Sequence, residues 1–128
     1  MNKMGCLFAF LSTIFFWSCR KDPDLRQYTL ADIEYINIAD TTQAAVVTHF
    51  MIYFHKPSPC SEVVELLIDD RIDTIDYQVQ LLNPLGACPV TSTRDSLLTH
   101  FHRDSPGIYT VRFFRQDEEP LVHEIFVR

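Results

Sequence analysis

All seven prolines of the 128-residue chain fall between short runs of apolar, β-branched and aromatic residues. Proline cannot donate a hydrogen bond to a β-ladder, so its absence from these runs indicates strands. Seven strands with turn-rich connections and no convincing helix predict an all-β fold, a β-sandwich. The seven expected strands cover residues 31–39, 45–55, 62–68, 75–81, 91–102, 108–115 and 121–128.

Three of these runs leave alternatives open. In 31–39 the apolar positions change phase, which a β-bulge near Tyr35 would explain, although a helical turn over 30–34 competes. The run 45–55 is apolar on both faces, as expected of a central strand that is covered on both sides or meets a neighbour on its outer face. The run 62–68 also fits helical spacing, but its β-branched content and short length favour a strand.

The N-terminal segment has the pattern of a secretory leader. Lys3 supplies a positive charge, residues 6–17 are largely apolar, and the chain turns polar at Arg20. A helix of about twelve residues rises only about 18 Å, too short for the roughly 30 Å hydrocarbon core. We therefore expect export and no spanning helix. A buried N-terminal core helix is the competing interpretation, and Arg20 and Pro23 count against it.

Ser18 and Cys19 directly follow the apolar run. A small residue before a cysteine at this place resembles the signal of bacterial lipoproteins, in which the thiol is diacylated and becomes the first residue after cleavage. Phe16 and Trp17 depart from that signal, which has an aliphatic and a small residue there. Ordinary signal-peptidase cleavage is the alternative, but no A-x-A-like pair precedes a suitable site. The resemblance divides the chain into a signal peptide, a lipidated cysteine with its tether, and a β-sandwich domain, over residues 1–18, 19–29 and 30–128.

Lipidation at Cys19 would anchor the domain without spanning the membrane. One acyl chain binds a bilayer only marginally, whereas two or more attach a protein stably. The resemblance thus implies an exported, membrane-anchored protein of the bacterial cell envelope. Arg20 stands where an aspartate would signal retention in the inner membrane, so the outer membrane is expected if the organism has two.

Composition bounds the partners. Removal of residues 1–18 leaves 110 residues, one domain's worth, with 10 basic and 17 acidic side chains and a net charge of −7. An acidic surface without a basic stripe excludes nucleic acid as an expected partner.

The cysteines predict one disulfide. Cys6 leaves with the leader and Cys19 takes the lipid, so Cys60 and Cys88 remain. Two cysteines in an oxidising compartment are typical of a disulfide, and closing a loop of about 29 residues would stabilise the fold by roughly 3–4 kcal/mol. A metal-binding thiol pair or a redox couple is the alternative, but neither has C-x-x-C spacing.

Cys60, the segment Ala87-Cys88-Pro89 and the segment 105–111 (Ser-Pro-Gly-Ile-Tyr-Thr-Val) together resemble a pattern of bacterial exported immunoglobulin-like domains of unknown function. In that pattern a cysteine after a proline-containing loop pairs with one before the penultimate strands, and a Pro-Gly-x-Tyr-x-Val turn opens the F strand. The match covers roughly residues 45–128. Antibody-type domains have a cysteine at the place of Val111 and a buried core Trp, both missing here, so an antibody-like function is not implied.

Histidines are the main candidates for chemistry. His100 and His102 would point from one face of a strand, a spacing that suits zinc or copper, and three histidines are possible third ligands: His49, His55 and His123. A solvated sheet face that carries histidines by chance is the simpler interpretation, so no metal site is predicted. Ser96 with His100 lacks the third member of a triad.

For two further groups of residues, four aspartates and four aromatics, we prefer a structural interpretation to a binding site. Four aspartates invite a calcium site, but the spacing lacks the glycine and terminal glutamate of an EF-hand, so a charged turn is expected: Asp69, Asp70, Asp73 and Asp76. Four aromatics could form a binding surface, but filling the space between two sheets is the commoner role: Tyr53, Phe54, Phe113 and Phe114. After residue 18 only Gly86 and Gly107 remain, which argues against glycine-rich phosphate loops.

The sequence therefore predicts a lipid-anchored cell-envelope protein with a binding or structural role, no catalytic activity and no cofactor. Its expected partners are the membrane, through Cys19, and a protein or glycan of the envelope. Two alternatives remain: a metal-binding or hydrolytic envelope enzyme that uses His100 and His102, and an inhibitor or immunity-like protein of an envelope enzyme.

Overall fold

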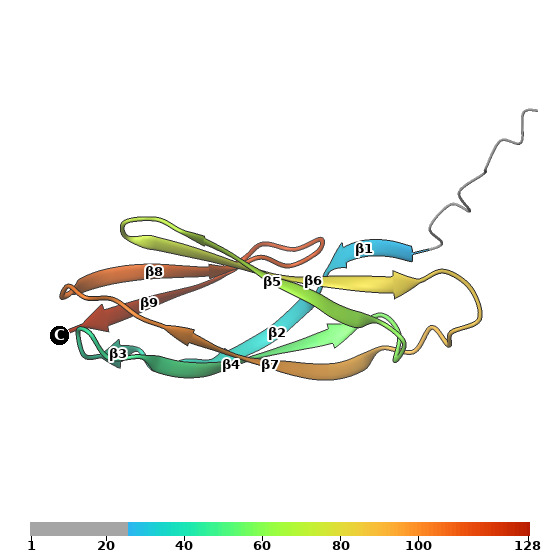
Figure 1. The fold of residues 1–128 in the computed structure, drawn as a ribbon, viewed down its shortest axis with the longest axis horizontal. Helices are drawn as coiled ribbons and strands as arrows, with labels where there is room; N and C mark the ends of the chain where they lie inside the picture. Colours follow the sequence, from blue (N-terminus) through green and yellow to red (C-terminus); the bar gives the residue numbers. More distant parts are fainter. Residues whose placement is uncertain (1–25) are drawn as a thin grey trace, which may run out of the picture.

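The computed structural model describes residues 26–128, which form nine strands and no helix (Figure 1). All seven predicted strands are present, and two short strands, β1 and β3, join them. The strands are β1 (Arg26–Leu30), β2 (Asp32–Asn37), β3 (Thr41–Thr42), β4 (Thr48–Lys56), β5 (Glu62–Asp70), β6 (Thr74–Pro84), β7 (Thr93–Phe101), β8 (Gly107–Phe113) and β9 (Leu121–Val127).

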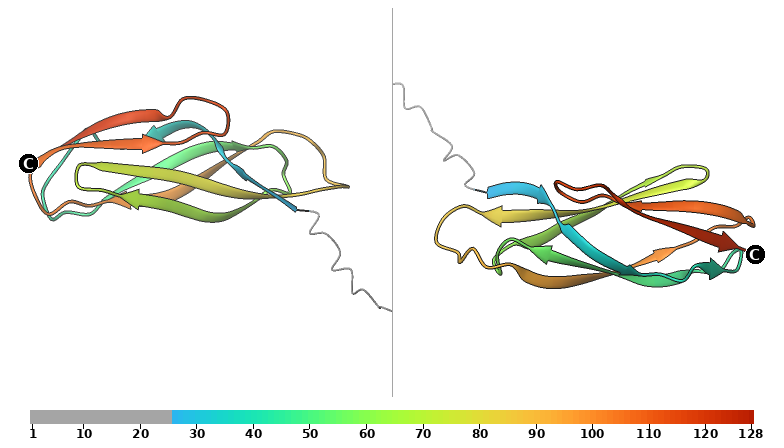
Figure 2. Two further views of the ribbon diagram at one scale, coloured as in Figure 1. Left: turned by 90° about the horizontal axis from the view of Figure 1, so that it is seen from above. Right: turned by 180° about the vertical axis from the view of Figure 1, so that it is seen from behind.

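The strands form two sheets that face each other as a sandwich (Figures 1 and 2). The six-stranded sheet runs β1-β6-β8-β9-β3, with β5 also paired to β6. The three-stranded sheet runs β2-β4-β7. Two pairs of the larger sheet, β6–β8 and β3–β9, are parallel, and its other pairs are antiparallel.

The start of the domain differs from the prediction. Residues 26–29, expected to belong to the tether, lie in β1, whose Arg26 pairs with Pro84 at the end of β6. The polar composition hid this strand because backbone hydrogen bonds, rather than apolar side chains, hold it to the sheet. The chain then changes sheets at Ala31, which is fully buried and donates its N–H to the carbonyl of Val79 at 2.8 Å.

The predicted bulge is present in β2. Ile33 pairs with Phe54 and Tyr35 with Tyr53, so Glu34 is the extra residue. The shift lies one position before the expected place and explains the change of phase, because Ile33 is buried and Tyr35 is exposed. The competing helical turn is wrong.

Strand β4 is central, as predicted, and lies between β2 and β7. Its Phe50, Ile52 and Phe54 point into the core and are at most 2% exposed. Its outer face meets a neighbour within the same sheet, because Tyr53 stacks on Tyr35 with ring centroids 4.4 Å apart.

An aromatic cluster fills the centre of the sandwich. Tyr77 and Phe113 stack at 5.1 Å, and Phe50 from the opposite sheet meets both rings edge-on at 5.7 and 5.9 Å. Burying a side chain of this kind stabilises the fold by roughly 1.5–3 kcal/mol. The Tyr77 hydroxyl donates to the carbonyl of His100 at 3.2 Å, and burial raises the pKa of Tyr77 to about 12.

Candidate functional site

The leader and Cys19 lie outside the described residues, but the point of entry into the domain is defined. Strand β1 begins opposite the last residue of β6, at the end of the sandwich that also holds the β4–β5 and β6–β7 connections (Figure 1). We call this the entry end.

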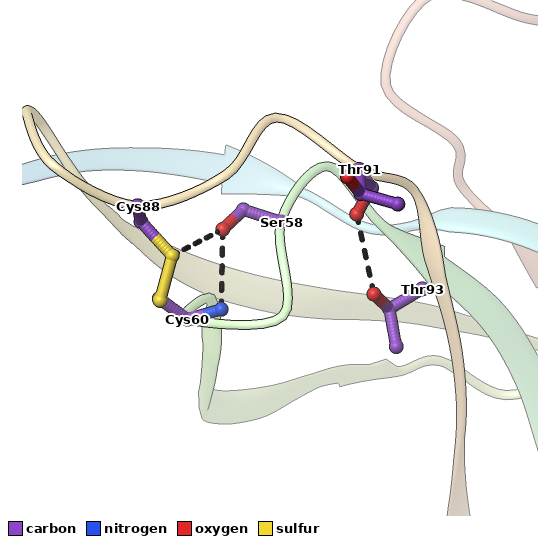
Figure 3. The surroundings of a disulfide bond; sticks show 5 residues. All are labelled: Ser58, Cys60, Cys88, Thr91 and Thr93. Atoms are coloured by element: carbon purple, nitrogen blue, oxygen red, sulfur yellow. Dashed lines mark hydrogen bonds between the residues drawn. A yellow bond between two sulfur atoms is a disulfide. The ribbon is translucent and has the colours of Figure 1, made fainter.

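The disulfide lies at the entry end. The structure joins Cys60 to Cys88, as the sequence predicted, with their Cα atoms 6.2 Å apart. The two connections that hold these cysteines both cross between the sheets, so the bond joins the β4–β5 connection to the β6–β7 connection. Buried Ser58 supports it: its hydroxyl donates to Cys88 Sγ at 2.9 Å and accepts from the Cys60 N–H at 3.1 Å (Figure 3).

An ionic contact lies at the opposite end, which we call the far end. Arg103, two residues after the end of β7, donates two hydrogen bonds to the Asp70 carboxylate at 2.5 and 2.9 Å and a third to the carbonyl of Arg71 at 3.1 Å. Its own carbonyl accepts the N–H of Ala45 at 2.7 Å. Arg103 thus links β5 of one sheet to β7 of the other, and its hydrogen bonds lower the pKa of Asp70.

The aspartates singled out in the sequence do not gather around one point. Asp76 is buried on the outer face of the larger sheet, where Arg112 binds both of its oxygens at 2.7 Å and Arg71 approaches at 3.1 Å. Asp69 also pairs with Arg71, at 2.8 Å. Arginine, absent from the sequence argument about calcium, is the partner of Asp69, Asp70 and Asp76, whereas Asp73 accepts a hydrogen bond from the Thr74 hydroxyl at 3.2 Å.

Strand β5 is an edge strand. It pairs with β6 along its whole length, and no second strand of residues 26–128 pairs with its other side. Leu66 packs against the core, but the other four apolar side chains of β5 are 37–48% exposed: Val63, Val64, Leu67 and Ile68. An open edge with exposed apolar residues is a template for an added strand.

The acidic residues of β5 fall into two groups. Asp69 and Asp70 have arginine partners, whereas Glu62 and Glu65 form no ion pair within the described part of the chain. The open edge therefore combines apolar side chains with two uncompensated carboxylates.

The outer face of the three-stranded sheet brings His100 together with His49, while His100 and His102 both border a hollow of about 400 Å³. His49 and His100 stand directly opposite each other on β4 and β7, with ring centroids 6.3 Å apart. His102 follows the end of β7, and its Nε2 lies 3.4 Å from Asp104. His55 lies near the other end of β4 and His123 lies in the other sheet. Among residues 26–128, no three His, Cys, Asp or Glu side chains are grouped so that they could hold a metal.

A serine, a histidine and a carboxylate form a line that the sequence analysis missed. The Ser92 hydroxyl lies 3.3 Å from His55 Nδ1, and His55 Nε2 lies 3.2 Å from Glu34. Ser92 and His55 border a hollow of about 470 Å³. The composition is that of a hydrolase triad, but Arg94 holds Glu34 at 2.7 Å and so competes for its charge. Only the strand register brings these residues together.

The aromatic candidates divide between core and surface. Phe54 and Phe113 are fully buried in the core. Tyr53 lies on the outer face against Tyr35. Phe114 leaves the core side, and the guanidinium of Arg112 covers its ring at 5.4 Å, which accounts for the adjacent Phe113–Phe114 pair.

Comparison with models of protein families, with curated proteins and with solved structures finds no match for this chain. Within residues 26–128 no helix has the length and apolar character needed to cross a membrane.

Proposed function

We propose that the protein is a lipid-anchored binding protein of the bacterial cell envelope, held at the membrane by lipid on Cys19 and bound to a protein partner along β5. The observation that carries the binding role is the open β5 edge with its exposed apolar side chains. The signal pattern around Cys19 supports the anchor, and an outer-membrane location follows if the organism has two membranes.

The chemistry of β5 defines the partner. A strand added to this edge would gain main-chain hydrogen bonds and would place its apolar side chains against Val64, Leu67 and Ile68. Glu62 and Glu65 favour lysine or arginine on the incoming strand, because opposite charges across strands stabilise the pair. The β5 strand of a second copy offers no lysine or arginine to pair with Glu62 and Glu65. The partner is therefore an extended, apolar segment with basic residues.

The proposal assigns no catalytic residue. The contacts from Ser92 through His55 to Glu34 are the observation that most favours a hydrolase instead. A serine-directed fluorophosphonate is therefore the appropriate probe. We expect no covalent adduct on Ser92 under conditions that label a serine hydrolase fully. Labelling that Ser92→Ala and His55→Ala both abolish would replace the binding role with a hydrolytic one.

We also propose that the sandwich is a variant of the immunoglobulin-like class. Tyr109, two positions before Val111, donates its hydroxyl to the carbonyl of Ser105 at 2.9 Å, which matches the tyrosine corner of such domains. The parallel β6–β8 pair departs from their antiparallel sheets. Unchanged stability of the Tyr109→Phe variant would remove the support that this contact gives.

The anchor is tested by incorporation of labelled palmitate in the native host. We expect label in the wild type and in Cys6→Ala, a matched cysteine of the leader, and none in Cys19→Ala. Equal labelling of Cys19→Ala would refute the anchor and leave the β5 proposal standing.

The binding role is tested with a photo-crosslinking amino acid at Leu67 of β5 and, as a control, at Leu98 of β7, the exposed leucine of another edge strand. We expect one discrete adduct from position 67 only, mapped to a basic extended segment. Glu65→Lys should weaken it, while Glu124→Lys on β9 should not. No adduct, an adduct of two copies, or an adduct from position 98 alone would contradict the proposal.

A further inference from the structure

A second site lies on the outer face of the three-stranded sheet, away from β5. His49 and His100 are directly opposed on neighbouring antiparallel strands, and both side chains are exposed. Their ring planes make an angle of 65°, and their centroids are 6.3 Å apart. The strands fix the two imidazoles side by side, and no carboxylate pairs with either of them among the ion pairs of the described residues.

We propose that His49 and His100 form a chelating site for a divalent transition metal, Cu²⁺ above all. Two imidazoles that share a metal at about 2.0–2.1 Å from each nitrogen have ring centroids roughly 4.5 Å apart when the angle at the metal is 90° and roughly 6.4 Å apart when it is 180°. The observed separation of 6.3 Å lies at the wide end of this range, so the two exposed side chains must rotate to bring one nitrogen of each ring to the metal.

Copper follows from the ligand chemistry. Imidazole suits zinc, copper and nickel, and the order of affinities at a given nitrogen site places Cu²⁺ above Ni²⁺ and Zn²⁺. Water completes the coordination, because the described residues offer no third His, Cys, Asp or Glu.

The other histidines provide internal controls. His55 Nε2 faces Glu34 at 3.2 Å, His102 Nε2 faces Asp104 at 3.4 Å, and His123 lies in the other sheet. None of them stands opposite another histidine in the strand register. A metal that binds through chance surface histidines would not distinguish His49 and His100 from these three.

The experiment is titration of the full chain, with Cys6→Ser and Cys19→Ser to remove thiols that would reduce and bind copper, in detergent with Cu²⁺ alone, followed by calorimetry and electron paramagnetic resonance. We expect one Cu²⁺ per chain, with hyperfine structure from two nitrogens. His49→Ala or His100→Ala should each weaken binding at least tenfold, and the double variant should lose little more than either single variant, because a chelate needs both rings. Zn²⁺ and Ni²⁺ should bind more weakly than Cu²⁺.

Three matched variants separate this site from its rivals: His55→Ala, His102→Ala and His123→Ala should bind Cu²⁺ as the wild type does. Unaltered circular dichroism of the His49 and His100 variants would confirm that folding is intact. Absence of stoichiometric binding, or a loss of affinity in a control variant as large as in His49→Ala, would overturn the proposal. None of these outcomes bears on the β5 partner.

Discussion

The two ends of the sandwich are closed by different chemistry. At the entry end, the disulfide between Cys60 and Cys88 ties the two connections that cross between the sheets. At the far end, Arg103 joins the sheets through the Asp70 carboxylate and the carbonyl of Arg71. A covalent bond holds regardless of pH and salt but fails on reduction. The ionic contact weakens with acid and salt but is insensitive to reductant. Each end can therefore be destabilised separately.

The largest effect should come from opening the entry end. We expect the double variant Cys60→Ser, Cys88→Ser to lose about 3–4 kcal/mol of unfolding free energy, because the unfolded chain gains the entropy of an open loop. Urea denaturation measures this loss, and reductant should lower the stability of the wild type to that of the variant. A wild type insensitive to reductant would mean that the bond does not form.

Opening the far end should cost less. Arg103→Met keeps an apolar stem over the rings of Phe101 and Tyr109 but removes the guanidinium, and we expect a loss of about 1.5–3 kcal/mol, the usual range for hydrogen bonds to charged groups. Arg94→Met is the control, since Arg94 pairs with Glu34 at the surface and should contribute at most about 1 kcal/mol. Equal losses in the two variants would show that Arg103 does not link the sheets.

The tyrosine corner near the far end should contribute a smaller amount. Tyr109→Phe removes the hydroxyl that donates to Ser105 and should cost about 0.5–1.5 kcal/mol by urea denaturation. Tyr28→Phe, on the exposed surface of β1, should leave stability unchanged. An unchanged unfolding free energy in Tyr109→Phe would mean that the hydrogen bond to Ser105 does not stabilise the far end.

The smallest effect is the pH dependence of the far end. Because Arg103 lowers the pKa of Asp70 in the fold, the ionised carboxylate adds stability above the unfolded pKa of about 3.9, and this contribution disappears as pH falls through the folded value. The stability difference between wild type and Asp70→Asn should be at most about 1 kcal/mol at pH 7 and should shrink below about pH 3.9. A difference that grows on acidification would contradict the ion pair.

The sequence predicted where the strands lie along the chain better than it predicted which strands pair with each other. Alternation and proline placement located seven strands and even the phase change of β2, because burial of one face is a local pattern. Strands β1 and β3 were missed, since backbone pairing rather than side-chain burial holds them. The extent of β6 was also underestimated, as it reaches Pro84.

The contacts that matter for function depend on register and sheet order, which sequence patterns do not specify. His100 was expected to act with His102, but antiparallel pairing places it opposite His49, 51 positions earlier. Arg103 gave no signal because its partner Asp70 lies on another sheet, 33 residues away. The open edge of β5 depends on sheet order as well, because in the described domain β5 pairs with β6 alone.

The account depends most on export, lipid attachment at Cys19 and closure of the disulfide. The intact mass of the protein recovered from host membranes tests all three together. We predict a chain that begins at Cys19, carries the added mass of acyl chains and is two hydrogens lighter than the fully reduced form. A mass that includes Met1, lacks acyl groups and matches free thiols at Cys60 and Cys88 would contradict the account.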